Sequence, residues 1–131
     1  MVLLPAIAGH FADHPEAVSV AGHHLSWEEL AHRAGCLASA MRGLPSVAVE
    51  ATPDLGTVVA VVAGLMAGVP VVPVPPDAGP VERQHILGNS GAAALPVPDT
   101  EPASVPEPPD HAAALVMYTS GTTGPPKGVV L

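Results

Sequence analysis

Apolar residues recur at helical spacing in the segment that follows Ser26. They lie three and four positions apart and predict an amphipathic helix that ends near Gly43; these residues are Trp27, Leu30, Ala34, Leu37 and Met41. Ser26 and Glu29 have the spacing of a capping box, in which a hydroxyl and a carboxylate each satisfy a free backbone amide. The start of this helix is therefore specified by two side chains as well as by the apolar pattern.

A second helical segment, from about 55 to 67, is apolar on almost every side. Residues 52–54 provide start signals for it, and Gly68 ends it. A helix of this kind is expected to be buried against a sheet or another domain. Short extended runs at 46–50 and 69–74 come before and after the helix, and we expect both to be strands. The prolines of the second run favour a strand at a sheet edge or one that leaves the sheet.

Weaker signals extend this alternation toward both ends of the chain. Pro80 and the pair Gly88-Asn89 bracket a short third helix. The further segments are strands at 17–20, 24–26, 92–95 and 112–118, the third helix at 81–87, and an extended run at 129–131. Proline and acidic residues dominate 96–110, which we expect to be an irregular connector. Alternating strands and helices predict an α/β fold with a layered, largely parallel sheet and flanking helices.

The composition and charge of the chain limit the cellular location and the binding partners that we expect. The chain has 131 residues and a formal net charge of −8, from 12 acidic and 4 basic residues. Binding to nucleic acid requires clustered Lys and Arg, so we expect no nucleic-acid partner. A single cysteine, Cys36, cannot form an internal disulfide, and the amino terminus lacks the pattern of a signal peptide or a membrane span. We therefore expect a soluble, cytoplasmic protein with no membrane partner.

One segment, Tyr118 to Gly128, has residue types that call for a chemical explanation. Its glycines let successive backbone amides turn inward, its Ser and Thr hydroxyls are donors on short arms, and Lys127 is a cation. These are the groups that hold a triphosphate. The Walker A pattern requires glycine five positions after the first glycine, where this chain has Pro126, and Ser or Thr after the lysine, where it has Gly128. The spacing therefore excludes a P-loop.

The same run resembles the signature loop of the adenylate-forming superfamily. That superfamily includes acyl- and aryl-CoA synthetases, luciferases and the adenylation domains of nonribosomal peptide synthetases. Residues 25–30, Leu-Ser-Trp-Glu-Glu-Leu, and residues 65–74, Leu-Met-Ala-Gly-Val-Pro-Val-Val-Pro-Val, resemble earlier motifs of the family in the expected order. The resemblance covers most of the chain. It implies that residues 1–131 form a partial amino-terminal subdomain of a larger AMP-binding domain, with its phosphate-binding loop at 118–128.

The resemblance implies a reaction in two steps. ATP and a carboxylic acid give an acyl-adenylate and pyrophosphate, and the acyl group then passes to a thiol such as that of coenzyme A. It also implies that the loop binds the β- and γ-phosphates with the help of Mg²⁺, with Lys127 and Thr122 as the catalytic residues. The implied phosphate-binding set is Thr119, Ser120, Gly121, Thr122, Thr123, Gly124, Lys127 and Gly128.

Several interpretations of the fragment stay open. The leading one is an acyl-CoA synthetase, because Thr122-Thr123 stands where peptide synthetase domains often have Ser-Thr; the composition resembles bacterial synthetases for small acids such as malonate. One alternative is an adenylation domain that serves a carrier protein. Another is a non-catalytic interaction module that associates through a sheet edge and the apolar helix 55–66. The later motifs of the family are absent, so we expect 1–131 to be inactive without the remainder of the enzyme chain.

The other candidate residues have simpler interpretations. His10 and His14 are four positions apart, but Pro15 and the lack of a third ligand disfavour zinc, and we expect no metal site. His23 and His24 adjoin a predicted turn and cannot chelate together from one strand. Cys36 is expected to be a small packing residue in the middle of a helix, without a polar cluster around it.

Overall fold

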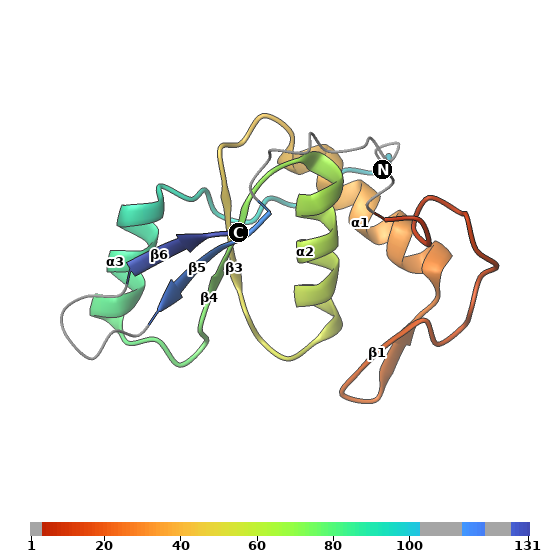
Figure 1. Ribbon diagram of the computed structural model, residues 1–131, viewed down its shortest axis with the longest axis horizontal. Helices are drawn as coiled ribbons and strands as arrows, with labels where there is room; N and C mark the ends of the chain where they lie inside the picture. Colours follow the sequence, from red (N-terminus) through yellow and green to blue (C-terminus); the bar gives the residue numbers. More distant parts are fainter. Residues whose placement is uncertain (1–3, 103–113, 120–126) are drawn as a thin grey trace.

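Helices and strands alternate along the chain in the computed structural model, in which residues 4–102, 114–119 and 127–131 are described. Figure 1 shows strands β3 to β6 between α3 on one side and α2 with α1 on the other. This arrangement confirms the predicted α/β class with flanking helices. The elements are β1 (Val18–Val20), β2 (His23–Leu25), α1 (Trp27–Met41), β3 (Val47–Glu50), α2 (Leu55–Ala67), β4 (Val71–Val74), α3 (Pro80–Ser90), β5 (Val116–Thr119) and β6 (Lys127–Val130).

Both long helices begin at the side chains that the sequence indicates. Ser26 Oγ accepts a hydrogen bond of 3.0 Å from the Glu29 amide, and α1 starts one residue after the serine. Asp54 Oδ1 accepts one of 3.0 Å from the Thr57 amide at the start of α2. Gly68 ends α2 with a φ of 67°, a left-handed conformation that favours glycine.

The central strands combine parallel and antiparallel pairing. β3 and β4 are parallel, and single parallel bridges join Val47 to Ala93 and Val71 to Leu115. β5 and β6 are antiparallel, as are β1 and β2 in a separate hairpin. The strand predicted at 92–95 is therefore reduced to the bridge at Ala93. The largely parallel sheet is confirmed for β3, for β4 and for the bridge at Leu115 just before β5, and β6 reverses the direction.

β4 lies at the edge of the two-stranded sheet that it forms with β3, in agreement with the expectation from its prolines. It pairs with β3 over its whole length, and the Val71 amide donates to the Ala114 carbonyl on its other side, at 2.9 Å. Pro73, two residues further along, has no amide with which to continue that pairing. The missing donor explains why β4 meets the β5 segment through a single bridge instead of a longer ladder.

Alternate residues of β3 and β4 face two different helical layers. Val47, Val49 and Val71 belong to a core shared with α1 and α2. Val72 and Val74 pack with Ile86 of α3 in a second core. Burial on both faces explains why these short strands are apolar almost throughout.

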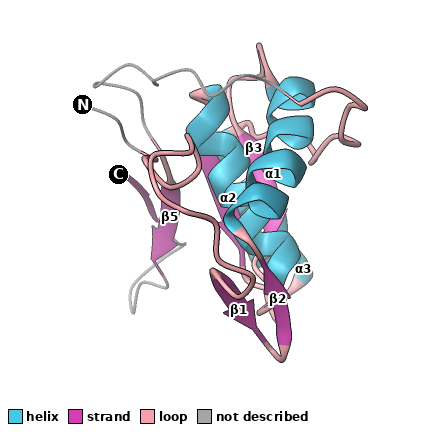
Figure 2. Cartoon of the chain, turned by 90° about the vertical axis from the view of Figure 1, so that its right-hand side faces the viewer, coloured by secondary structure: helices cyan, strands magenta, loops and turns pink. Residues whose placement is uncertain are grey.

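The apolar helix α2 packs into the main core of this chain through Val59, Ala60, Ala63 and Met66. Figure 2 shows it beside α1, and from residue 57 onward none of its residues is exposed. Val58, Val61 and Val62 are only partly buried, so the interaction surface suggested at 55–66 stays a prediction. None of the described helices is long and apolar enough to cross a bilayer.

Helix α3 is longer than the sequence indicates. It was expected to stop at Gly88-Asn89, but both residues are helical and the helix reaches Ser90. Gly91 ends it with a φ of 64°, and the Gly91 amide donates to the Leu87 carbonyl at 3.1 Å. The expected stop was wrong because Gly88 keeps the helical conformation, and the glycine that leaves it comes three residues later.

The connector predicted at 96–110 is irregular where it is described, at 96–102. It is nevertheless attached to α1, because the Asp99 amide donates to the Cys36 carbonyl at 2.9 Å and Ser39 Oγ donates to the Glu101 carbonyl at 3.0 Å. Residues 103–113, which include the rest of the connector and the first two residues of the strand predicted at 112–118, lie outside the described residues.

Helix α2 lies close to β4 at Gly64, and this contact can be tested. A Cβ at this position would lie 2.5 Å from Val71 Cγ2 and 2.9 Å from the Val69 carbonyl oxygen. We expect Gly64→Ala to lower the free energy of unfolding by about 1–3 kcal/mol, because the helix must move away from the strand. Urea unfolding of the 131-residue chain measures the change.

Gly88→Ala is the matched control for this prediction. A Cβ at Gly88 in α3 meets no atom within 4 Å, so the helix gains a better helix former without a clash. We expect the free energy of unfolding to stay the same or rise by up to about 1 kcal/mol. Equal effects of the two substitutions would contradict the close contact of α2 with β4.

Candidate phosphate-binding site

The structure describes both ends of the predicted phosphate-binding loop 118–128. Tyr118 and Thr119 end β5, and Lys127 and Gly128 begin β6. Thr119 is the register partner of Lys127, and Tyr118 is that of Gly128. The lysine therefore begins a strand and not a helix, as the failed Walker spacing indicated. The predicted residues Ser120, Gly121, Thr122, Thr123 and Gly124 lie outside the described residues.

Tyr118 is attached to helix α3. Its hydroxyl donates a hydrogen bond of 2.6 Å to Asn89 Oδ1. Its ring meets the His85 ring edge to face, with 6.1 Å between centroids and 89° between planes. The same ring packs against the second core, beside Val72 and Val74. Sequence reasoning missed Asn89 and His85, although their spacing of four residues places them on one face of a helix.

Gly128 lies under the ring of Tyr118. A Cβ at this position would be 3.3 Å from Tyr118 Cζ and 3.4 Å from its hydroxyl oxygen, closer than most real contacts of this kind. This glycine is therefore explained by the room that the aromatic ring needs, with no turn or positive φ involved. Lys127 is exposed beside it.

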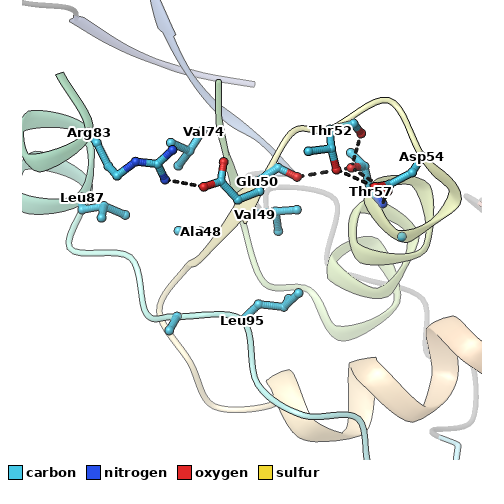
Figure 3. Close-up of a pocket in the computed structure, with 12 residues that line it drawn as sticks. Ala48, Val49, Glu50, Thr52, Asp54, Thr57, Val74, Arg83, Leu87 and Leu95 are labelled. Atoms are coloured by element: carbon cyan, nitrogen blue, oxygen red, sulfur yellow. Dashed lines mark hydrogen bonds and ion pairs between the residues drawn. The ribbon is translucent and has the colours of Figure 1, made fainter. Parts of the chain in front are cut away.

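A hollow lies at the carboxyl ends of the parallel strands β3 and β4, where α/β sheets commonly bind ligands (Figure 3). Its volume is about 460 Å³ and its wall is mostly apolar. Glu50 Oε1 pairs with Arg83 Nη1 at 2.6 Å across one side of it. On the other side Thr52 Oγ1 donates to Asp54 Oδ2 at 2.6 Å. The charged groups of this hollow are thus engaged in holding α3 and the start of α2.

Comparison with known proteins identifies the family. Residues 6–104 and 95–131 match the AMP-binding enzyme family. The chain belongs to this family. The adenylate-forming superfamily that the loop indicated is thereby confirmed, and the run from Tyr118 to Gly128 is part of the matched region.

Individual relatives of this AMP-binding chain agree with that assignment. A malonyl-CoA ligase, solved as a ternary product complex with methylmalonyl-CoA and AMP bound, is 37% identical, with a TM-score of 0.79 over 98% of this chain and 32% of that one. IdnL7 is 25% identical, with a TM-score of 0.71 over 98% of this chain and 34% of that one. The probable nonribosomal peptide synthetase CymA of Salinispora arenicola (strain CNS-205) is 35% identical over 92% of this chain and 2% of its own length. The chain therefore spans about a third of the first two relatives and far less of the third.

The structure also shows the surroundings of Cys36 and His14 in this AMP-binding chain. Cys36 is buried, as expected of a packing residue, but its Sγ lies 3.7 Å from His32 Nε2 beside a hollow of about 520 Å³. His32 lies one helical turn away on the same face, and this single imidazole does not make the polar cluster that was expected to be absent. His14 Nδ1 accepts a hydrogen bond of 3.0 Å from the Glu16 amide. Within the described ranges, no group of three or more His, Cys, Asp or Glu side chains could hold a metal ion.

The cap of α2 predicts a pH dependence of stability. Hydrogen bonds from the Thr52 hydroxyl and then the Thr57 amide hold the pKa of Asp54 below its usual 3.8. A carboxylate with a lowered folded-state pKa stabilises the protein above the unfolded pKa, and this stability is lost as the pH falls through the folded value. We expect Asp54→Asn to remove this part of the acid destabilisation, measured by urea unfolding from neutral to acidic pH. An unchanged dependence on pH in the variant would contradict the role of the carboxylate.

Proposed function

We propose that this chain contributes to the ATP-dependent activation of a carboxylic acid in an acyl-CoA synthetase. A carboxylate oxygen of the acid attacks the α-phosphorus of ATP, the bond to the β-phosphate oxygen breaks, and pyrophosphate leaves. The sulfur of a thiol then attacks the acyl carbonyl, and AMP leaves. The observation that carries the proposal is the run 118–128 in a chain of the AMP-binding family. Lys127 and Gly128, at the end of this run, are the first two residues of β6.

In this proposal the loop binds the phosphates that leave. Negative charge develops on the pyrophosphate as its bond breaks, and donors placed there lower the barrier most. Lys127 would supply a cation from the start of β6, on a flexible arm that is exposed. The remaining donors in the proposed set are Thr119, Ser120, Gly121, Thr122, Thr123, Gly124 and Gly128.

Magnesium fits this scheme as a partner of ATP. Mg²⁺ usually keeps several waters and is held by substrate phosphates with one or two carboxylates, so it needs no dedicated cage of protein ligands. The hydroxyls and the lysine in the run 118–128 are suited to bind phosphate oxygens. In this scheme Mg²⁺ is bound by the triphosphate. When bound, Mg²⁺ neutralises charge on the leaving group.

The choice of thiol and acid rests on the relatives. The malonyl-CoA ligase aligns with 98% of this chain at 37% identity, which supports coenzyme A as the acceptor and a small acid of the malonate type. The probable peptide synthetase CymA aligns at 35% identity, which supports the alternative of an adenylation domain that serves a carrier protein. Because the chain spans 32% of the ligase, we propose that the groups for adenine and the acid come from further residues of the enzyme. The cytoplasmic location stays a prediction.

Carboxylate-dependent exchange of labelled pyrophosphate into ATP tests the activation step. We expect no exchange by residues 1–131 and measurable exchange by a polypeptide that carries them together with the later segments of the family. Gly124→Trp should abolish exchange because its side chain would fill the space of the phosphates. Lys127→Ala should lower the exchange rate about 10²- to 10³-fold, the usual effect of removing one transition-state donor.

Arg33→Ala is the control for loss of a positive charge. Arg33 is exposed on α1, which α2 separates from β5 and β6 (Figure 1), so exchange should keep the rate of the unsubstituted enzyme. Exchange by residues 1–131 would contradict the dependence on further residues. Absence of exchange in the longer polypeptide across many acids would overturn the proposed activity.

The acceptor can be identified with the same polypeptide. We expect free coenzyme A to take the acyl group and malonate or methylmalonate to be better substrates than long-chain acids, as measured by mass spectrometry of the thioester product. A phosphopantetheinyl carrier protein is the competing acceptor in a parallel reaction. Transfer to the carrier protein and not to coenzyme A would favour the adenylation domain over the acyl-CoA synthetase.

A further inference from the structure

We propose that Tyr118 is a positioning residue for the phosphate-binding loop, held by Asn89 of α3 and in turn fixing the start of β6 at Gly128. This inference rests on the proposed function, because it assigns a purpose to contacts at the base of the loop. Tyr118 and Asn89 lie outside the phosphate-binding set, whereas Gly128 belongs to it. The observations behind it are one hydrogen bond, one ring contact and one glycine with no room for a side chain.

The hydrogen bond ties the base of the loop to a helix. Tyr118 is the last residue but one of β5, and its hydroxyl donates to Asn89 Oδ1 at 2.6 Å, a short distance for this type of bond. The two residues are 29 positions apart, so the bond joins separate parts of the fold. Asn89 is an exposed residue in the last turn of α3, where it has no part in the core.

Helix α3 is a firm support for this contact. Ile86 is fully buried and packs with Val72 and Val74 of β4, so the helix is fixed on the sheet. His85 lies one turn before Asn89 and meets the tyrosine ring edge to face. The ring is thus held from two positions on one helix, which restricts both its tilt and its rotation.

The ring then determines where β6 begins. Tyr118 and Gly128 are register partners, and the space above Gly128 that a Cβ would need is occupied by the ring, at 3.3 Å. Lys127 precedes Gly128 directly and pairs with Thr119. A shift of the ring therefore changes the position of the residue next to the lysine. Displacements of about 1 Å in a positioning group can lower a rate by about 10²-fold, so such control is chemically useful.

The effect of removing the Tyr118 hydroxyl differs between a packing role and a positioning role of this residue. The aromatic ring of Tyr118 packs beside Val116 against the second core, and Tyr118→Phe keeps that packing. Only the hydrogen bond to Asn89 is lost. If the ring merely filled space, removal of the hydroxyl would leave phosphate binding unchanged.

The test measures MgATP and magnesium pyrophosphate binding by the 131-residue chain through the amide NMR signals of Lys127 and Gly128. We expect saturable shifts with the unsubstituted chain. Tyr118→Phe and Asn89→Ala should each weaken binding about three- to tenfold, the range expected for the loss of one hydrogen bond. The double variant should be no weaker than Tyr118→Phe, because both substitutions remove the same bond.

Gln84→Ala is the matched control, since it removes an exposed amide side chain from the same helix. Its binding should equal that of the unsubstituted chain. Unchanged binding in Tyr118→Phe and Asn89→Ala, or additive losses in the double variant, would overturn the positioning role. Absence of any shift with the unsubstituted chain would also overturn it, because the base of the loop would then not respond to phosphates.

Steady-state kinetics of the longer polypeptide separate this inference from the proposed function. We expect Asn89→Ala to raise the KM for MgATP about three- to tenfold and to leave the KM for the acid unchanged. Exchange activity that ignores Tyr118→Phe and Asn89→Ala would refute the positioning role and leave acid activation standing. Phosphate binding that responds to both variants, without any exchange, would refute acid activation and leave the positioning role standing.

Discussion

The contact between α2 and β4 at Gly64 is the constraint on which the rest of the structure depends. A side chain at this position would collide with Val71, so the glycine lets the helix lie directly on the strand. Val71 in turn pairs with Val47 of β3, and its amide donates to the Ala114 carbonyl just before β5. One valine therefore connects the main core to the strand that leads into the phosphate-binding loop.

The attachment of β5 has a weak point that a second contact offsets. Pro73 cannot donate to the neighbouring strand, so backbone pairing of β4 with the β5 segment is limited, among the described residues, to the bridge of Val71 and Leu115. The far end of β5 is held instead by the hydrogen bond from Tyr118 to Asn89. On the side away from β6, the strand is thus held at its start by backbone pairing and near its end by a side chain of another layer.

The sequence predicted features whose causes act over a few residues. Ser26, Asp54 and Gly68 each act on backbone groups of the adjoining helix, and all three were recognised. The end of α3 was missed because helical and left-handed conformations are both accessible to glycine, so Gly88 and Gly91 look alike in a sequence.

The candidate site likewise has one part that the sequence predicted and one part that it did not. The residue types of the run 118–128 indicated phosphate binding, and the family match confirmed the superfamily. The contact of Tyr118 with Asn89 could not be predicted, because it joins residues 29 positions apart and depends on how α3 packs on β4. A periodic pattern records which face of a helix is buried, and it does not record which exposed residue meets a distant strand.

The electrostatics of the chain give these neutral contacts their importance. With a net charge of −8, the protein repels a triphosphate at long range, although salt screens this repulsion beyond roughly 8 Å. In the proposed function, affinity for phosphate comes from short-range donors and from Lys127, whose benefit depends steeply on distance. A tyrosine hydroxyl, an amide oxygen and a glycine fix the base of the loop without adding or neutralising charge. In the proposed arrangement these neutral groups set the position of the residue next to Lys127, and they carry no charge that would oppose a phosphate.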